Sequence, residues 1–299
     1  MDRLSHKVIL VHKGALGDFL QTWPSIYSIV TSSQVSTVLW AGREEHFFWL
    51  RPLPVEMLGW RERMLVDRLY CCEEPPLQLQ GSSLVWFGLN LPPNERPVPG
   101  LFFLKGIGEE REVVWHRYLR QLPRLGILPA GDWRDAWQRF FPIVSKEIVA
   151  IFPGSGHPLK NWSLKRFEEV ARRLEKMGER VVFVLGPVEV ERGLVPSSRW
   201  ERVVSSHMKG LFSLLQKTKL CIGNDSGPLH LAGFMGIPSV CIFGPTDPLR
   251  WGPVGARIVK TPRSCAPCTP LIDIKCTQRL CLEDIGVESV WKEVEGLLF

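Results

Sequence analysis

Short apolar runs alternate along this chain with longer segments whose apolar residues recur every three or four positions. The run at residues 8–12 ends in a glycine-rich turn, and residues 18–30 then follow with helical spacing. Such a pair predicts a buried strand followed by an amphipathic helix. Further strands are predicted at residues 35–40, 83–87 and 100–104, and a helix at residues 113–125.

The same alternation restarts after a proline-bearing stretch at residues 141–146. The pattern predicts strands at residues 147–152, 180–185, 220–222 and 239–243, and helices at residues 163–177, 209–217 and 227–235. Two successive runs of this kind predict an α/β protein with two doubly wound, Rossmann-like domains. We expect domains at residues 1–144 and 145–286. A closing helix within residues 287–299 could pack on either of them.

Charge and hydropathy narrow the class of protein. The chain has 299 residues and a net charge of +6, which is spread over both halves, so we expect no nucleic-acid partner. The longest mostly apolar stretch, residues 231–244, is interrupted by glycine and proline. It falls short of the roughly 20 residues that a membrane-spanning helix needs. We therefore expect a cytoplasmic protein.

The run G-N-D-S-G-P-L-H lies between a predicted strand and a predicted helix. Pro228 suits the first turn of that helix, whose free amide groups and dipole favour an anion. Asn224, Asp225 and Ser226 have capping of the helix as their alternative role. A cap does not need Gly227, however, whereas a closely approaching phosphate group does.

A second loop, P-G-S-G-H-P-L-K-N-W, also follows a strand and precedes a helix. Lys160 stands just before the helix, where it could place a positive charge on a phosphate group. Taken alone, Lys160 would be an ordinary exposed lysine. Two such loops at the carboxyl ends of strands in one domain favour a ligand site, because open α/β sheets bind ligands there.

A third loop, K-G-A-L-G-D, follows the first predicted strand. Its glycine spacing matches neither the phosphate-binding loop of nucleoside triphosphatases nor the dinucleotide-binding fingerprint. Asp18 could serve only as a helix cap, or it could be the carboxylate of a general base.

Four motifs together resemble those of the heptosyltransferases of glycosyltransferase family nine. They are G-x-x-G-D at residues 14–18, P-G-S followed by K-N-W at residues 153–162, G-N-D-S-G-P-x-H at residues 223–230, and F-G-P-T-D-P at residues 243–248. The resemblance implies the GT-B architecture, with two Rossmann-like domains facing a cleft. It also implies an inverting transfer that needs neither metal nor cofactor.

The resemblance further implies a donor and an acceptor. The donor would be a nucleotide sugar, ADP-heptose, bound mainly by the second domain. The acceptor would be a lipid-linked anionic glycan, the inner core of lipopolysaccharide, which faces the first domain. Such an enzyme would work in the cytoplasm at the inner face of the cytoplasmic membrane.

Residue roles follow from the same resemblance. Asp18 would take the proton of the acceptor hydroxyl, and Lys160 would neutralise the leaving diphosphate. Glu189 would bind the ribose, with Glu191 as the alternative. The remaining residues expected to bind the donor are Gly17, Ser155, Gly156, Asn224, Asp225, Ser226, Gly227, Pro228 and His230.

Other functions stay open on the sequence. The protein could use a different nucleotide sugar, or it could be a binding relative without catalytic activity. Cys265, Cys268, Cys276 and Cys281 could support a metal-binding or redox-sensing protein. Their spacing does not form two C-x2-C pairs, so free thiols or one disulfide are the alternatives to a metal site.

Overall fold

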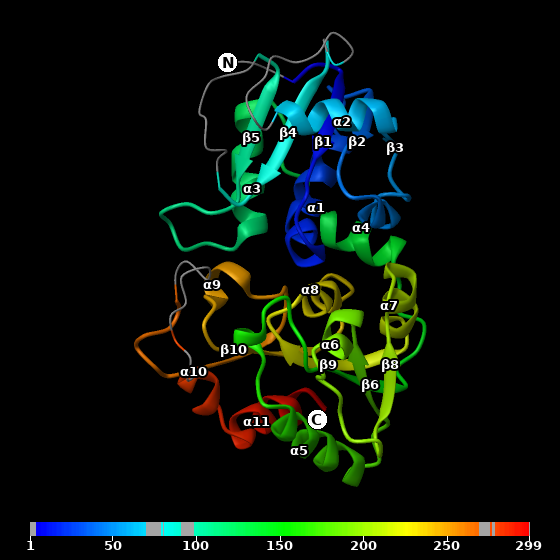
Figure 1. Cartoon of the computed structure of the whole chain (residues 1–299). Helices are drawn as coiled ribbons and strands as arrows, with labels where there is room; N and C mark the ends of the chain where they lie inside the picture. Colours follow the sequence, from blue (N-terminus) through cyan, green and yellow to red (C-terminus); the bar gives the residue numbers. More distant parts are fainter. Residues whose placement is uncertain are drawn as a thin grey trace. The chain divides into compact units, whose positions relative to one another are not determined.

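The computed structural model describes residues 4–69, 79, 81–90, 99–268, 276 and 279–298 (Figure 1). The chain divides into two compact units, Met1–Ala136 and Trp137–Phe299. The division falls within helix α4 (Trp133–Phe140), eight residues before the boundary predicted between residues 144 and 145. Each unit has its own parallel sheet, as the alternating pattern predicts.

The first unit contains a five-stranded parallel sheet in the order β3-β2-β1-β4-β5. Its strands are β1 (Lys7–Val11), β2 (Thr37–Trp40), β3 (Val55–Met57), β4 (Ser83–Gly88) and β5 (Leu101–Lys105). Its helices before the division are α1 (Leu16–Val30), α2 (Trp60–Leu69) and α3 (Val114–Gln121), together with a 3-10 turn at Glu44–Trp49.

Alternate residues of the central strands bury opposite faces of this sheet. Ile9, Val11, Leu84 and Trp86 pack with Val66 of α2 in one buried cluster. Helix α3 packs against α1. The predicted helix at residues 113–125 is shorter than expected, because α3 gives way to a 3-10 turn at Leu122–Leu125 that Gly126 ends with a φ of 79°.

The second unit contains a six-stranded parallel sheet in the order β11-β10-β9-β6-β7-β8. Its strands are β6 (Ile148–Phe152), β7 (Val181–Leu185), β8 (Glu201–Val204), β9 (Thr218–Asn224), β10 (Ser239–Phe243) and β11 (Arg257–Lys260). Its helices include α5 (Leu164–Lys176), α6 (Pro187–Glu191), α7 (Met208–Leu215), α8 (Gly227–Phe234), α9 (Pro248–Trp251), α10 (Leu280–Glu283) and α11 (Val287–Leu298).

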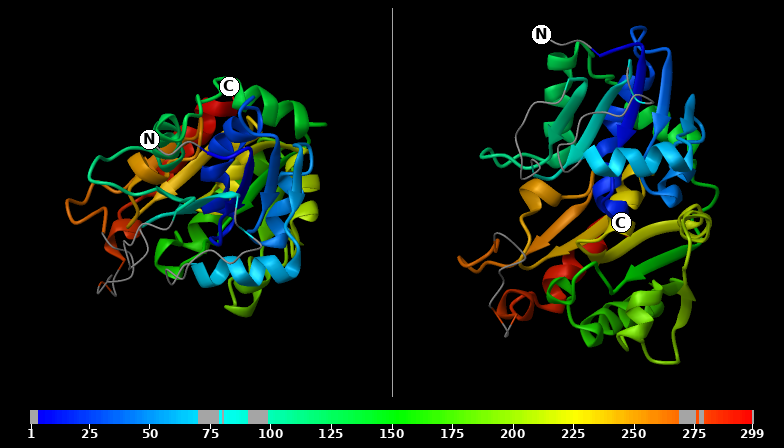
Figure 2. Two further views of the ribbon diagram at one scale, coloured as in Figure 1. Left: turned by 90° about the horizontal axis from the view of Figure 1, so that it is seen from above. Right: turned by 45° about the horizontal axis from the view of Figure 1, so that its top comes forward.

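The closing helix α11 belongs to the core of the second unit. Val290 and Val294 are fully buried in the cluster that α5 and the sheet form, and α11 contacts α5, β10 and β11. Figures 1 and 2 show α11 in red beside α5 in green. The structure thus packs the closing helix in the second unit.

Both sheets reverse their winding next to their first strand. In the first sheet, β1 lies between β2 and β4, and in the second, β6 lies between β7 and β9. Neighbouring strands whose connections run to opposite faces leave a crevice at their carboxyl ends, where ligands bind in doubly wound proteins. Three of the four sequence motifs lie in loops that follow β1, β6 and β9, so each of these three lies at one of the two points. The fourth motif, at residues 243–248, follows β10. In the described part of the chain, no helix has the length and apolarity required to cross a membrane.

Candidate functional site

Asn224 fastens the two motif loops of the second unit to each other. It is the last residue of β9 and is fully buried. Its amide nitrogen donates a hydrogen bond of 2.8 Å to the carbonyl oxygen of Pro153, and its amide oxygen accepts one of 2.9 Å from the backbone N–H of Trp162. Asn224 therefore fixes the position of the loop after β6 relative to the end of β9.

A largely buried ion pair, Lys160 with Asp225, also joins the loop after β6 to the loop after β9. Lys160 Nζ donates to the carbonyl oxygen of Asp225 at 2.9 Å and to its carboxylate Oδ2 at 3.1 Å. His230 Nε2 lies 3.7 Å from the other carboxylate oxygen. Burial alone would raise the pKa of the Asp225 carboxyl, but Lys160 and His230 outweigh it and lower that pKa to about 2. Asp225 is therefore a carboxylate that holds Lys160 in place.

The start of helix α8 adjoins this pair. Ser226 is the N-cap residue, and Pro228 lies in the first turn. The Ser226 hydroxyl is buried and has no hydrogen-bond partner among the described residues. In the first turn Pro228 has no N–H, and the N–H of Leu229 donates to the carbonyl oxygen of Ser226 at 3.1 Å. The Ser226 hydroxyl and the N–H of Gly227 therefore remain as donors at the start of the helix.

Glu189 lies directly against the loop that follows β6. Its Oε2 accepts a hydrogen bond of 2.9 Å from the N–H of Gly186 at the start of α6. A Cβ atom on Gly154 would stand 2.2 Å from Glu189 Cγ, so any side chain at residue 154 would displace Glu189. Glu189 lines the neighbouring pocket, whereas Glu191 is exposed and does not line it.

The loop after β6 is held partly by hydrogen bonds between its own residues. The Ser155 hydroxyl is buried and lies 2.8 Å from the carbonyl oxygen of His157 and 2.6 Å from Asn161 Oδ1. Gly156 is exposed, and a Cβ atom there would have no atom within 4 Å. The backbone of the loop is thus accessible at Gly156, whereas the Ser155 hydroxyl is already hydrogen-bonded within the loop.

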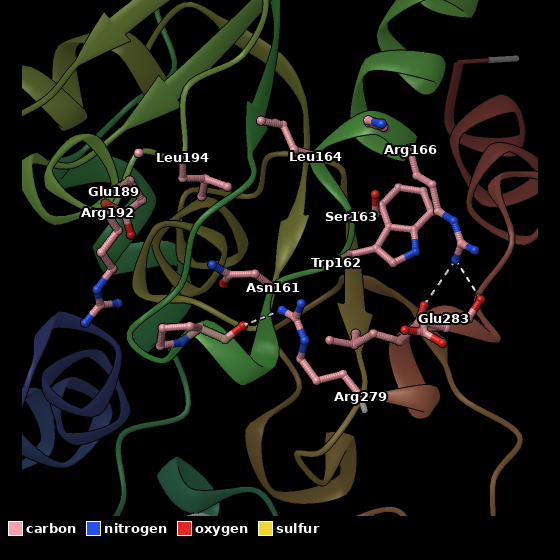
Figure 3. A pocket seen from close by; sticks show the side chains of 14 residues that line it. Asn161, Trp162, Ser163, Leu164, Arg166, Glu189, Arg192, Leu194, Arg279 and Glu283 are labelled. Atoms are coloured by element: carbon pink, nitrogen blue, oxygen red, sulfur yellow. Dashed lines mark hydrogen bonds between the residues drawn. The ribbon is translucent and has the colours of Figure 1, made fainter. Parts of the chain in front are cut away.

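A pocket of about 820 Å³ in the second unit is lined by Asn161, Trp162 and Glu189 among other residues. Figure 3 shows Glu189 and Arg192 on one side of it and Arg166 and Glu283 on the other. Arg279 also lines the pocket and donates a hydrogen bond of 3.3 Å to the carbonyl oxygen of Pro158. Neither Arg192 nor Arg279 belongs to one of the four sequence motifs.

The first unit has a separate pocket at its own switch point. It measures about 530 Å³ and is lined by residues that follow β1 and β4, among them His12, Lys13, Asp18 and Asn90. Asp18 is the third residue of α1, and its Oδ2 accepts a hydrogen bond of 3.3 Å from the N–H of Ala15. The carboxylate therefore supports the helix start and also faces a pocket. Gly17 precedes it in the first turn of α1, in the first unit, whereas the other expected donor-binding residues lie in the second.

Two buried histidines lie close together in the first unit, and one of them, His12, lines this pocket. The rings of His12 and His46 have centroids 6.1 Å apart, and His46 stacks on Phe19. Burial, the neighbouring His46 and Arg43 lower the pKa of His12 to about 3, and burial and Arg43 lower that of His46 to about 4. Both imidazoles are therefore uncharged at neutral pH.

The four cysteines near the carboxyl end line one cavity of about 210 Å³. They are Cys265, Cys268, Cys276 and Cys281. Residues 269–275 lie outside the described residues. Within the described residues, no three Cys, His, Asp or Glu side chains are placed to hold a metal ion. Burial and the neighbouring thiols raise the pKa of Cys268 and Cys281.

The two doubly wound units and the loops at their switch points define the GT-B class of glycosyltransferases. A family model described as "Glycosyltransferase family 9 (heptosyltransferase)" matches residues 115–279, which is more than half of the chain. The chain belongs to this family.

Curated relatives and solved structures agree with the family assignment. The lipooligosaccharide heptosyltransferase 2 of Campylobacter jejuni is 28% identical over an alignment of 171 residues, and the match covers 51% of this chain and 52% of the relative. The match thus spans about half the length of that relative. A family 9 glycosyl transferase from Veillonella parvula has the same fold, with a TM-score of 0.71, 20% identity and coverage of 99% and 98% of the two chains. The E. coli heptosyltransferase WaaC with ADP gives a TM-score of 0.67 at 16% identity, with coverage of 97% and 99%.

The ion pair leads to a stability prediction. Lys160→Met should lower the free energy of unfolding by about 3 kcal/mol, because it leaves the buried Asp225 carboxylate without its cation. Adding Asp225→Asn should restore most of that loss. Urea denaturation followed by circular dichroism measures both, with Lys209→Met on the exposed face of α7 as control. Equal stability of the Lys160 and Lys209 variants would contradict the assigned role of the pair.

The histidines lead to a pH prediction. Their folded-state pKa values lie below the ordinary value of 6.5, so the unfolded chain binds protons first as the pH falls. Stability should therefore be complete above pH 6.5 and be lost toward pH 4. His46→Phe should reduce the loss of unfolding free energy between pH 7 and pH 5 by about 2 kcal/mol. Urea denaturation at the two pH values measures this, and an unchanged loss would show that folding does not lower the pKa of His46.

Proposed function

We propose that the protein is an inverting, metal-independent glycosyltransferase that moves heptose from ADP-heptose to the inner core of lipopolysaccharide. The observation that carries the proposal is the group of donors at the switch point of the second sheet. Lys160, the Ser226 hydroxyl and the start of α8 converge there. This combination suits a pyrophosphate, because fixed N–H groups and one ammonium stabilise its charge.

Lys160 suits a leaving diphosphate in particular. Its ammonium group has three hydrogens, of which two are used by the carbonyl and carboxylate oxygens of Asp225. The third is available to a phosphate oxygen. Because Asp225 holds the ammonium in position, Lys160 needs no rearrangement when negative charge develops on the diphosphate. The charge that a divalent metal would supply therefore has a source in the chain itself.

The pocket beside this site suits the nucleoside. Glu189 lines the pocket and lies on Gly154, so its free carboxylate oxygen can accept hydrogen bonds from ribose hydroxyl groups. We assign the ribose contact to Glu189 in preference to Glu191. Gly156 and Gly227 allow close approach of the phosphate groups to the backbone.

Asp18 suits the general base. In the proposed step it takes the proton of an acceptor hydroxyl while the hydroxyl oxygen bonds to the anomeric carbon of heptose. The bond from that carbon to the diphosphate breaks on the opposite side, ADP leaves, and the configuration inverts. The pocket of about 530 Å³ beside Asp18 is the proposed acceptor site.

The acceptor and the place of action rest on the relatives. The curated proteins that match are lipooligosaccharide and lipopolysaccharide heptosyltransferases. A lipid-linked anionic glycan as acceptor would bring the enzyme to the inner face of the cytoplasmic membrane, as a cytoplasmic protein without a nucleic-acid partner.

Replacing the proposed base separates an enzyme from a binding relative. Asp18→Asn keeps an oxygen for the N–H of Ala15 but cannot take a proton, so kcat should fall by about 10²- to 10⁴-fold. The affinity for ADP should stay the same. The assay detects transfer of heptose from ADP-heptose to deacylated lipopolysaccharide of a heptose-free strain by mass spectrometry. No turnover by the unaltered protein would favour the binding relative, and full turnover by the variant would remove Asp18 from the mechanism.

Calorimetry tests the donor and the need for metal. ADP should bind in the presence of EDTA and should raise the melting temperature, because Lys160 and α8 supply the positive charge. UDP and GDP serve as comparisons. Tighter binding of UDP or GDP would indicate a different nucleotide sugar, and ADP binding only with a divalent cation would contradict the metal-independent mechanism.

A further inference from the structure

His12 is a residue of the first pocket that the sequence motifs leave out. It directly follows β1 and is 4% exposed, and it lines the same pocket as Asp18. In the sequence it reads as the last residue of a buried strand. Its place at the carboxyl end of β1, at the switch point of the sheet, makes it a candidate for contact with a ligand.

One edge of the His12 ring lies close to Asp18. A Cβ atom on Gly14 would stand 2.9 Å from both Cε1 and Nε2 of His12 and 3.0 Å from Cβ of Asp18. The Nε2 edge and the base of the carboxylate side chain thus approach the same point. Glycine at residue 14 leaves the space between them open.

The other ring nitrogen is enclosed. Nδ1 of His12 is buried and has no hydrogen-bond partner among the described residues. A buried N–H without an acceptor is rarer in proteins than an under-used acceptor, so we assign the hydrogen of the neutral ring to Nε2. His46 and Arg43 lie nearby and, together with burial, keep the ring uncharged. The ring therefore offers one neutral donor on its pocket side.

We propose that His12 donates its Nε2–H to an oxygen of the acceptor sugar next to the hydroxyl that Asp18 deprotonates. This inference rests on the proposed function and deepens it. A neutral donor suits an uncharged sugar oxygen, and a second fixed contact beside Asp18 restricts which hydroxyl faces the carboxylate. His12 is thus a residue that positions the acceptor, while Asp18 alone exchanges the proton.

Three variants of His12 distinguish the ring nitrogens. Gln places an amide donor near the position of Nε2, Asn places one near the position of Nδ1, and Met fills the space without a donor. His12→Gln should keep the acceptor KM within about threefold of the unaltered value. His12→Asn and His12→Met should raise it about 10- to 100-fold, the range expected when one hydrogen bond to a desolvated sugar oxygen is lost.

The probe is deacylated lipopolysaccharide from a heptose-free strain, with ADP-heptose as donor. His6→Gln, at an exposed residue of the same unit, is the matched control. In all variants the donor KM and the melting temperature with ADP should be unchanged, which shows that the second unit is intact. The pH profile of kcat should also be unchanged, because an uncharged ring that only positions the acceptor contributes no ionisation to it.

The acceptor KM values of the three His12 variants decide whether the proposal holds. An acceptor KM raised in the Asn and Met variants but kept in the Gln variant supports the proposal. Equal acceptor KM in all three would overturn it, as would a lost ionisation in the pH profile of His12→Gln, which would make His12 a base. If the unaltered protein shows no turnover, the proposed function fails. Direct calorimetric binding of the same probe to the three variants then still decides the role of His12.

Discussion

The structure of the second unit depends on the contacts that join the loop after β6 to the end of β9. Asn224 forms hydrogen bonds with backbone groups near both ends of that loop, and the Lys160–Asp225 pair joins the loop to the residue after β9. A buried carboxylate without a cation is costly, so the two loops can only adopt an arrangement in which Lys160 reaches Asp225. Among the described residues, the same arrangement leaves the start of α8 and the Ser226 hydroxyl without protein acceptors. The stability of the loops and the proposed affinity for an anion thus have one physical origin.

The topology explains why both units have a pocket at a corresponding place. In each sheet the first strand lies between neighbours whose connections leave toward opposite faces. The first unit fills this crevice with a carboxylate and a neutral imidazole, Asp18 and His12, which suit hydroxyl groups. The second unit fills it with an ammonium, a hydroxyl and the start of a helix, which suit phosphate groups. The residues that follow β1, β6 and β9 therefore give the two crevices different chemistry.

The sequence predicts most of what is buried and misses much of what is exposed. Strands such as β1, β6 and β10 are buried along almost their whole length, so their apolar runs are unmistakable. The edge strands β3, β8 and β11 are short and partly exposed, and α2 is largely polar, so neither periodicity marks them. In α4, by contrast, the apolar residues Trp133, Ala136 and Trp137 have helical spacing that the sequence does show. The motif loops are predictable because glycine, proline and capping residues have local meaning. The tie made by Asn224 and the closeness of His12 to Asp18 are not, because both depend on contacts between parts of the fold.

The most direct test of the central claim is a calorimetric titration of the unaltered protein with ADP, AMP and adenosine in EDTA. If the loops after β6 and β9 hold a pyrophosphate, the dissociation constant should be at least about tenfold lower for ADP than for AMP, because the second phosphate gains charge-assisted hydrogen bonds. The dissociation constant of adenosine should be higher than that of AMP. Equal affinity for the three ligands would contradict a pyrophosphate site at Lys160 and Ser226.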